Sequence, residues 1–146
     1  MSANAAVADR FEEFADRLAA RGVEYKPQAY RTAAENVRNY PRDVAELAGE
    51  GVEAVQEIEG VGEALAEKVV EYVETGTIAE LEDERERLPV EMGELTAVEG
   101  VGPKTVGTLY EELGVTDLDD LEAAAREGQI RELKRFGATP EQKSLE

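Results

Sequence analysis

The sequence predicts an all-α fold, on three observations. Apolar residues recur every three or four positions in nearly every segment, which is the period of an amphipathic helix. No stretch alternates apolar and polar residues for long enough to form a convincing strand. A short glycine-containing unit between two helical segments occurs twice, 40 residues apart. We therefore expect two small helical subdomains, each built around one copy of this unit.

The first two helices are predicted from apolar spacing and from their end residues. One face of the first helix carries Val7, Phe11, Phe14 and Leu18. Gly22 follows as the expected C-cap of this helix. The second helix is expected to hold Pro27 in its first turn and to end at Pro41, because proline lacks the amide that a helix interior needs.

The remaining elements follow in chain order. A short helix with Val44, Leu47 and Ala48 is expected to close at residues 49–51, and helices at 63–74 and 103–113 follow the two repeated units. Capping-box spacing occurs at Thr77 and Glu80, and again at Thr139 and Gln142. Residues 81–89 are highly charged and read as a connecting helix and linker. We place the domain boundary there, which gives domains of residues 1–88 and 89–146.

The repeated unit consists of an apolar residue followed by Glu-Gly-Val-Gly. The first copy runs from Ile58 to Gly62 and the second from Val98 to Gly102. A weaker, partial third copy covers residues 133–137, where Arg135 replaces the first glycine. Glycines permit positive φ in a short connection, and the valine between them is expected to turn back into the core.

Each glycine turn is a candidate phosphate site. The helix that follows presents unpaired amides and the positive end of its dipole. A dinucleotide fingerprint would need a third glycine and a strand, and a P-loop would need Gly-Lys-Ser/Thr, so neither reading fits. An ordinary helix–helix turn remains the alternative, although two matching copies favour phosphate binding. The candidate phosphate ligands are Gly60, Val61, Gly62, Gly100, Val101 and Gly102.

Composition excludes several classes of site. The 146 residues include no cysteine and no histidine, which rules out disulfides, structural zinc, thiol nucleophiles and histidine acid–base chemistry in this chain. No apolar run approaches the ~20 residues that a membrane-spanning helix needs. The first residues lack the basic flank and apolar block of a signal peptide. We expect a soluble, cytoplasmic protein.

The chain is strongly acidic, with 34 acidic and 16 basic residues and a net charge of −18. Such an excess usually argues against nucleic acid, because phosphate binding relies on lysine and arginine. Many acidic residues, few lysines and few aromatics are also typical of adaptation to molar salt, where the screening length falls to ~3 Å at about 1 M. The net charge therefore does not exclude DNA as a partner.

One segment departs from this acidity. Residues 21–42 carry five basic and two acidic residues, including Lys26 and Arg31, and form a candidate anion-binding surface. The alternative is that the arginines of this segment merely pair with neighbouring carboxylates.

The glycine units and the segments around them resemble those of a known family. The glycine units resemble the helix-hairpin-helix motif, which binds DNA backbones without reading bases. Residues 5–146 resemble the N-terminal part of family X DNA polymerases, the group that includes DNA polymerase beta. The salt-adapted composition adds the expectation of a halophilic archaeal source. The residues that carry the resemblance are 28–34, 39–41, 58–62, 66–69, 75–77, 95–104 and 109–114.

The resemblance implies a DNA-binding, monomeric module that positions gapped, nicked or 5′-phosphate-bearing duplex for a repair polymerase. It implies that the catalytic palm, with its Mg²⁺ site, lies in the remainder of a parent polymerase. Independently of the resemblance, the terminal Leu145-Glu146 is expected to be a cloning scar. By their position on the first turn of the helix after Gly102, Lys104 and Thr105 are expected to join the phosphate ligands, the alternative for Lys104 being a solvated lysine at a helix start. The resemblance also implies that backbone carbonyls hold K⁺ or Na⁺, namely those of Gln56, Ile58 and Val61 in one unit and Thr96, Val98 and Val101 in the other.

Some family members are 5′-deoxyribose-phosphate lyases, in which a lysine amine forms a Schiff base with the sugar aldehyde. Lys68 matches that nucleophile, Tyr30 a pocket residue and Lys26 a phosphate ligand. The pocket has lost positive charge, because positions that are lysine in DNA polymerase beta are here Gln56, Ala64 and Glu80, Thr32 replaces another and Tyr25 replaces a histidine. Glu63, Glu67 and Glu71 on the same helix are expected to keep the Lys68 amine charged, which opposes attack.

A non-catalytic protein-interaction domain is the competing hypothesis. Tandem hairpins serve that role in some families, and Glu59 and Glu99 inside the two units would repel a phosphate. Loss of DNA affinity after substitution of Gly102 and Lys104 would favour the DNA-binding hypothesis.

Overall fold

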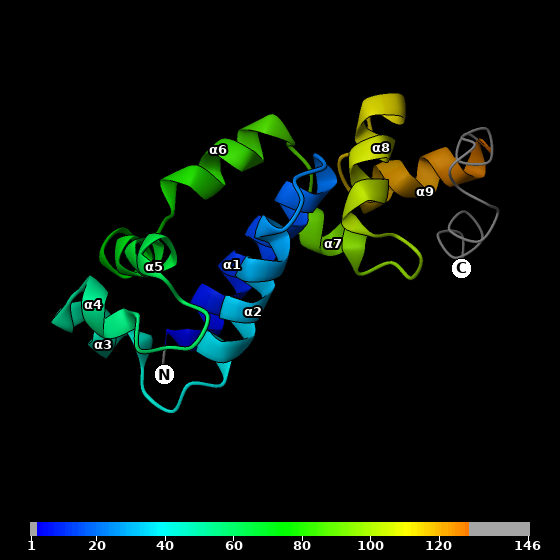
Figure 1. Cartoon of the computed structure of the whole chain (residues 1–146). Helices are drawn as coiled ribbons and strands as arrows, with labels where there is room; N and C mark the ends of the chain where they lie inside the picture. The colour runs from blue at the N-terminus through cyan, green and yellow to red at the C-terminus, as the bar shows by residue number, and fades with distance from the viewer. Residues whose placement is uncertain (1–2, 129–146) are drawn as a thin grey trace.

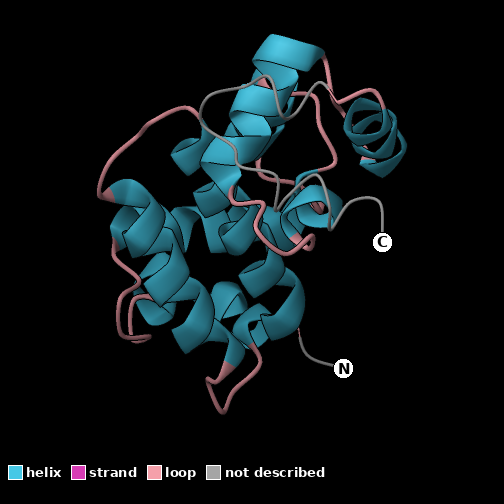
Figure 2. Cartoon of the chain, turned by 90° about the vertical axis from the view of Figure 1, so that its right-hand side faces the viewer, coloured by secondary structure: helices cyan, strands magenta, loops and turns pink. Residues whose placement is uncertain are grey.

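The computed structural model describes residues 3–128, and this part of the chain is all-helical, as predicted (Figures 1 and 2). None of the helices in residues 3–128 combines the length and the apolar character that a membrane crossing requires. The nine helices of this part are α1 (Asn4–Ala20), α2 (Lys26–Arg38), α3 (Val44–Glu50), α4 (Val52–Val55), α5 (Glu63–Thr75), α6 (Ala79–Arg87), α7 (Met92–Thr96), α8 (Pro103–Leu113) and α9 (Leu118–Arg126).

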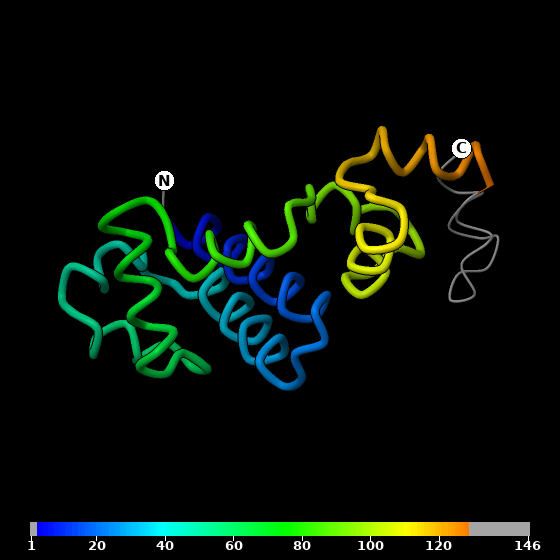
Figure 3. The backbone as a smooth tube through the Cα atoms, turned by 90° about the horizontal axis from the view of Figure 1, so that it is seen from above, coloured from blue at the N-terminus to red at the C-terminus, as the bar shows by residue number. Residues whose placement is uncertain are grey.

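Helices α1 and α2 form the central antiparallel pair, with their long axes side by side in Figures 1 and 3. The predicted apolar face of α1 is fully buried against α2. Gly22 follows the end of α1 with φ +82°, and Pro27 lies in the first turn of α2, both as predicted. The pair therefore forms because each helix has one apolar face and the turn between them has residues suited to it.

Asn4 fixes the start of α1 against the connection between α2 and α3. Its buried amide nitrogen donates to the carbonyls of Val37 (3.0 Å), Tyr40 (3.2 Å) and Arg42 (2.9 Å). Its amide oxygen accepts from the backbone N–H of Val44 at 2.9 Å. One side chain thus satisfies backbone groups at the end of α2 and at the start of α3, which would otherwise be orphaned.

The predicted capping box at Thr77 and Glu80 is wrong. Helix α6 begins one residue later than a Thr77 cap requires, and its N-cap residue, Ile78, makes no side-chain capping bond. Instead, the carboxylate of Glu71 on α5 accepts from the Ala79 N–H at 2.7 Å. The Thr77 N–H donates to the Thr75 hydroxyl, which in turn donates to the Thr77 carbonyl. A carboxylate from the preceding helix replaces the local cap because the α5–α6 turn brings it there. The second predicted box, Thr139 and Gln142, lies outside the described residues.

The apolar core of the described residues consists of two clusters. The larger one is built from α1 to α6 and ends at Leu81. The smaller one is built from α7 to α9 and the residues around them, between Val90 and Ala125. The two groups of helices lie at opposite ends of the elongated view in Figure 3. The partial third copy at residues 133–137 lies outside the described residues.

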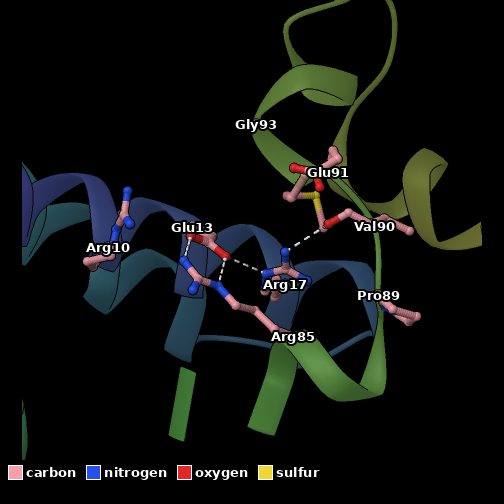
Figure 4. Close-up of a pocket in the computed structure, with 9 residues that line it drawn as sticks. Arg10, Glu13, Arg17, Arg85, Pro89, Val90, Glu91 and Gly93 are labelled. Atoms are coloured by element: carbon pink, nitrogen blue, oxygen red, sulfur yellow. Dashed lines mark hydrogen bonds and ion pairs between the residues drawn. The ribbon is translucent and has the colours of Figure 1, made fainter. Parts of the chain in front are cut away.

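A buried arginine ties the two clusters together (Figure 4). Arg17 on α1 is 5% exposed, and its guanidinium donates to the carbonyls of Leu88 (2.6 Å) and Val90 (2.9 Å) in the connection after α6. It also donates to Glu13 at 2.7 Å, and Glu13 accepts two further bonds from Arg85 of α6. The charged cluster of Glu13, Arg17 and Arg85 therefore holds the connection onto α1.

Close packing of α8 on the end of α1 adds a second link. A Cβ placed on Gly107 would come within 2.8 Å of the Ala20 carbonyl oxygen, which is closer than real Cβ atoms approach. Only a residue without a side chain lets the two backbones approach this closely.

Candidate nucleic-acid interface

The two glycine units have the same backbone geometry, 40 residues apart. In each, the valine N–H donates to the carbonyl three residues earlier at 3.0 Å, from Val61 to Ile58 and from Val101 to Val98. The first glycine of each unit has positive φ, +84° at Gly60 and +88° at Gly100. The sequence repeat is therefore a structural repeat, with a helix, a tight turn and a helix in each copy.

The second glycine of each unit has a different role from the one expected. Gly62 has φ −85° and Gly102 has φ −98°, so neither uses the left-handed region. Both are extended N-cap residues, and their carbonyls accept the first helical bonds of α5 and α8, from Ala66 (2.8 Å) and Val106 (3.0 Å). The expectation of positive φ is thus correct for one glycine of each pair and wrong for the other.

These N-caps leave amides open at the start of α5 and α8. Neither Gly62 nor Gly102 has a side chain, so neither N-cap satisfies the first amides of the helix. An anion at either helix start would meet free N–H donors and the positive end of the helix dipole. Val61 and Val101 between the glycines are 4% and 5% exposed, as the sequence predicts, and hold each turn against its core.

The two hairpins differ in charge and in support. Lys104 on the first turn of α8 is exposed, it forms no ion pair within residues 3–128, and that turn has no acidic residue. The first turn of α5 carries Glu63 instead. Thr105 beside Lys104 is half-buried. The second hairpin is therefore the better anion site by charge.

The first hairpin is braced by α2. The Asn36 side chain donates to the Glu59 carbonyl at 2.7 Å. A Cβ on Gly60 would meet Asn36 and Thr32 at 3.3 Å. This bracing was not foreseen, because residues 23 to 28 positions apart give no local spacing signal.

Two of the three predicted lyase residues line a small cavity between the end of α1, the start of α2 and helix α6, and Lys68 is not in its lining. The volume of this cavity is about 250 Å³. Tyr30 and Lys26 line it, and so do the carboxylates of Glu80 and Glu84. Lys68 of α5 forms an ion pair with Glu80, one of the lining residues, with its Nζ 3.3 Å from the Glu80 carboxylate. The Lys68 side chain is 12% exposed.

The partner of Lys68 was predicted incorrectly. The expected carboxylates were those of its own helix, and the structure pairs it with Glu80 of α6 instead. One of the expected partners, Glu71, caps α6. The α5–α6 turn brings Glu80 back across α5, which the spacing of residues along one helix does not reveal.

Tyr30 is a largely buried wall of this cavity. It is 7% exposed, its ring stacks on Phe14 at 4.5 Å between centroids, and it meets Phe11 edge-on at 5.6 Å. Burial raises the pKa of the Tyr30 hydroxyl, and the carboxylates of Glu80 and Glu84 raise it further. The phenol therefore stays protonated and can act as a hydrogen-bond donor toward the cavity.

The arginines of the basic segment are paired, which is the alternative that the sequence left open. Arg31 pairs with Asp16 at 2.9 Å, and Arg21 makes a two-pronged contact with Glu84 at 2.7 and 3.0 Å. Arg38 pairs with Asp9 at 2.8 Å and Arg42 with Glu50 at 2.7 Å. Lys26 has no ion pair within the described residues and is exposed. Of the segment's five cations, Lys26 is therefore the one free to meet an outside phosphate.

The carbonyls expected to hold a monovalent cation lie in the two turns. Those of Ile58 and Val98 each accept one backbone bond within their own turn, which leaves each a second lone pair. No group of three or more acidic side chains suited to a metal ion occurs in residues 3–128.

Comparisons with known proteins agree with this geometry. A family model described as "Helix-hairpin-helix domain" matches residues 2–78, and one described as "SAM-like Helix-hairpin-helix tandem" matches residues 92–143. The chain is also 28% identical, over 122 residues, to "DNA polymerase/3′-5′ exonuclease PolX" of Bacillus subtilis (strain 168). That match covers 84% of this chain and 20% of the relative, so the chain spans about a fifth of the relative's length. The resemblance to the N-terminal region of family X polymerases is thereby confirmed.

Proposed function

We propose that this chain, which belongs to the helix-hairpin-helix domain family, binds DNA through backbone phosphates and does not read base sequence. The observation that carries the proposal is the pair of glycine turns with the same backbone geometry, each followed by a helix whose first amides have no side-chain cap. Such amides suit phosphate oxygens, which every nucleotide presents alike. Lys104 adds a free cation at the second turn.

The relative supports the wider role. Its printed name makes it a DNA polymerase, and it is about five times as long as the match. We place the present chain as a monomeric, cytoplasmic DNA-positioning module in a longer family X polymerase, whose Mg²⁺-dependent palm lies in the remainder. Following the resemblance to family X polymerases, the proposed substrate is duplex with a gap or nick and a 5′-phosphate. A K⁺ or Na⁺ ion held by the turn carbonyls would add positive charge beside the phosphate.

Binding is tested by titrating a one-nucleotide-gapped duplex with a 5′-phosphate and following the amide resonances in KCl between about 0.1 and 2 M, where screening changes most. Saturable shifts should centre on residues 60–62 and 100–105. Lys104→Gln should weaken binding of all sequences alike and lower the slope of log affinity against log salt by about 1.

The matched control for Lys104→Gln is Arg126→Gln. It removes the same charge from an exposed arginine that already pairs with Glu122 on α9. Its affinity and its salt slope should stay closer to those of the wild type. Equal affinities for Lys104→Gln and the wild type would contradict the phosphate role and favour the protein-interaction hypothesis.

A second function, 5′-deoxyribose-phosphate lyase activity, is favoured by the position of Lys68 beside the cavity that Tyr30 and Lys26 line. The Lys68 amine would attack the sugar aldehyde carbon, and the resulting carbinolamine would lose water to form a Schiff base. Loss of a C2′ proton would then break the C3′–O3′ bond by β-elimination, which leaves the DNA strand with a 5′-phosphate. Hydrolysis of the Schiff base would release the sugar and restore the amine. The Lys68 amine would have to leave its ion pair with Glu80 before it could attack.

Borohydride reduction of a mixture with abasic gapped DNA tests the lyase function. A covalent adduct that forms with the wild type and is lost in Lys68→Arg would support it. An adduct of equal yield in Lys68→Arg, or none at all while DNA binding persists, would contradict it and leave the binding function standing.

A further inference from the structure

Unpaired cations are rare in this acidic chain. Of the twelve lysines and arginines in residues 3–128, nine form an ion pair with a carboxylate. Two of the others, Lys26 and Lys104, are exposed and belong to the proposed DNA sites. The third is Arg10 on α1, which is half-buried and which the proposed function does not use.

Arg10 has a buried donor without an acceptor. Its Nε atom is inaccessible to solvent and has no hydrogen-bond partner within the described residues. The nearby carboxylate of Glu13 is already taken by Arg17 and Arg85 (Figure 4). Figure 4 shows Arg10 apart from that cluster, with no bond to it.

The other carboxylates of α1 around Arg10 are also engaged, whereas that of Glu91, across the cavity, forms no ion pair within the described residues. Asp9 and Glu12 on the same helix both pair with Arg38, at 2.8 and 3.2 Å. Asp16 pairs with Arg31. A buried N–H of a charged group that lacks an acceptor is costly, so an acceptor from outside the chain would be favoured here.

There is room for such an acceptor between α1 and α7. Arg10 lines two adjoining cavities of about 560 and 320 Å³, and both also touch Glu13, Met92 and Gly93. The larger cavity, which we call the junction cavity, carries the charged groups of Arg10, Glu13, Arg17, Arg85 and Glu91. Its own lining has three guanidinium groups against two carboxylates, within a chain of net charge −18. The adjoining cavity adds the carboxylates of Asp9, Glu12 and Asp16, which already pair with Arg38 and Arg31.

We propose that the junction cavity is a binding site for a small oxyanion, with Arg10 as its ligand. A turn of the Arg10 side chain would bring its Nε–H and an adjacent terminal N–H into the cavity, where they form a planar fork that matches two oxygens of a phosphate or a carboxylate. Arg17 and Arg85 add positive potential, although their own bonds go to Glu13 and to backbone carbonyls. The site lies between the two hairpin units and does not depend on DNA binding.

Stability measurements on the whole chain test this site, because phosphate should reverse or reduce the stability difference between the wild type and Arg10→Met. Arg10→Met removes the unsatisfied N–H and keeps the stem, so this variant should be more stable than the wild type without the ligand. Added sodium phosphate at constant ionic strength should stabilise the wild type, shifting the folded-to-unfolded ratio about elevenfold when free phosphate is about ten times its Kd. Arg10→Met should lose that response.

Two further variants and one resonance make the result specific. Arg42→Met, at an exposed and paired arginine, should respond to phosphate as the wild type does. Arg10→Lys keeps the charge but lacks the fork, so its response should be weaker. The Nε–Hε resonance of Arg10 should shift saturably with phosphate, and a parallel titration with sodium acetate shows whether a carboxylate binds in the same place.

Two results would overturn the proposal. Equal stabilisation of the wild type and Arg10→Met would place the phosphate elsewhere on the chain. A wild type that responds to neither phosphate nor acetate, with an unmoved Arg10 Nε–Hε resonance, would mean that water satisfies this group.

Discussion

At the scale of single residues, the two glycines of each hairpin have different physical reasons to be glycine. Gly60 has φ +84°, and a Cβ there would meet Thr32 and Asn36 at 3.3 Å. Gly62 has φ −85° with open space around it, so its value lies in leaving the helix start uncovered. The first glycine maintains the turn and the second leaves the proposed phosphate site open.

Gly60→Ala should therefore lower the free energy of unfolding by about 1–2 kcal/mol, because an L-residue is strained at positive φ and the methyl must displace α2 side chains. Gly49→Ala is the matched control, since Gly49 lies within α3 with nothing near its Cβ position. That control should be unchanged or slightly more stable. Urea unfolding followed by circular dichroism measures both, and equal stabilities would contradict the strain argument.

At the scale of elements, α6 depends on a carboxylate from its predecessor. Glu71 of α5 accepts from the Ala79 N–H at the start of α6, where a negative charge also favours the helix dipole. Glu71→Gln should cost about 0.5–1 kcal/mol of unfolding free energy. It should also speed hydrogen exchange in the first turn of α6.

The control for Glu71→Gln is Glu74→Gln, which neutralises an exposed carboxylate on the same helix. It should leave exchange in α6 as in the wild type. Faster exchange in both variants alike would mean that general charge, rather than the cap, governs the start of α6.

The elements themselves were largely predictable from the sequence, because the signals are local. Helix α8 has the predicted bounds of Pro103 and Leu113, set by a proline start and by apolar spacing. What could not be predicted is contact between distant residues. Asn4 reaches residues 33 to 40 positions away, Arg17 reaches Val90, and Glu80 meets Lys68 across a turn. Such contacts depend on how helices pack, which spacing along one helix does not encode.

At the scale of the whole molecule, Glu13 links α1 to α6 and to the connection that follows. Burial alone would raise the pKa of Glu13, but hydrogen bonds from Arg85 and Arg17 outweigh burial and lower it from 4.5 to about 2. A lowered pKa means that this carboxylate stabilises the fold fully above about pH 4.5 and loses that contribution as the pH falls toward 2.

Glu13→Gln should accordingly be less stable than the wild type at neutral pH, because it leaves Arg17 and Arg85 with a poorer partner. The difference should shrink between about pH 4.5 and 2 as the wild type is protonated. Thermal unfolding of both proteins across that range measures it. A difference that stays constant with pH would show that the charge of Glu13 does not stabilise the junction.

The junction made by Arg17 and by the contact of Gly107 with Ala20 has a consequence for affinity. Two phosphate-binding hairpins on a flexible tether would sample many separations, whereas this junction holds them at one. If each hairpin binds a phosphate, as proposed, the second hairpin meets the same DNA at a high effective concentration only where the phosphates lie at the matching separation. Loosening the junction should therefore reduce avidity and selectivity for DNA shape while leaving each hairpin intact.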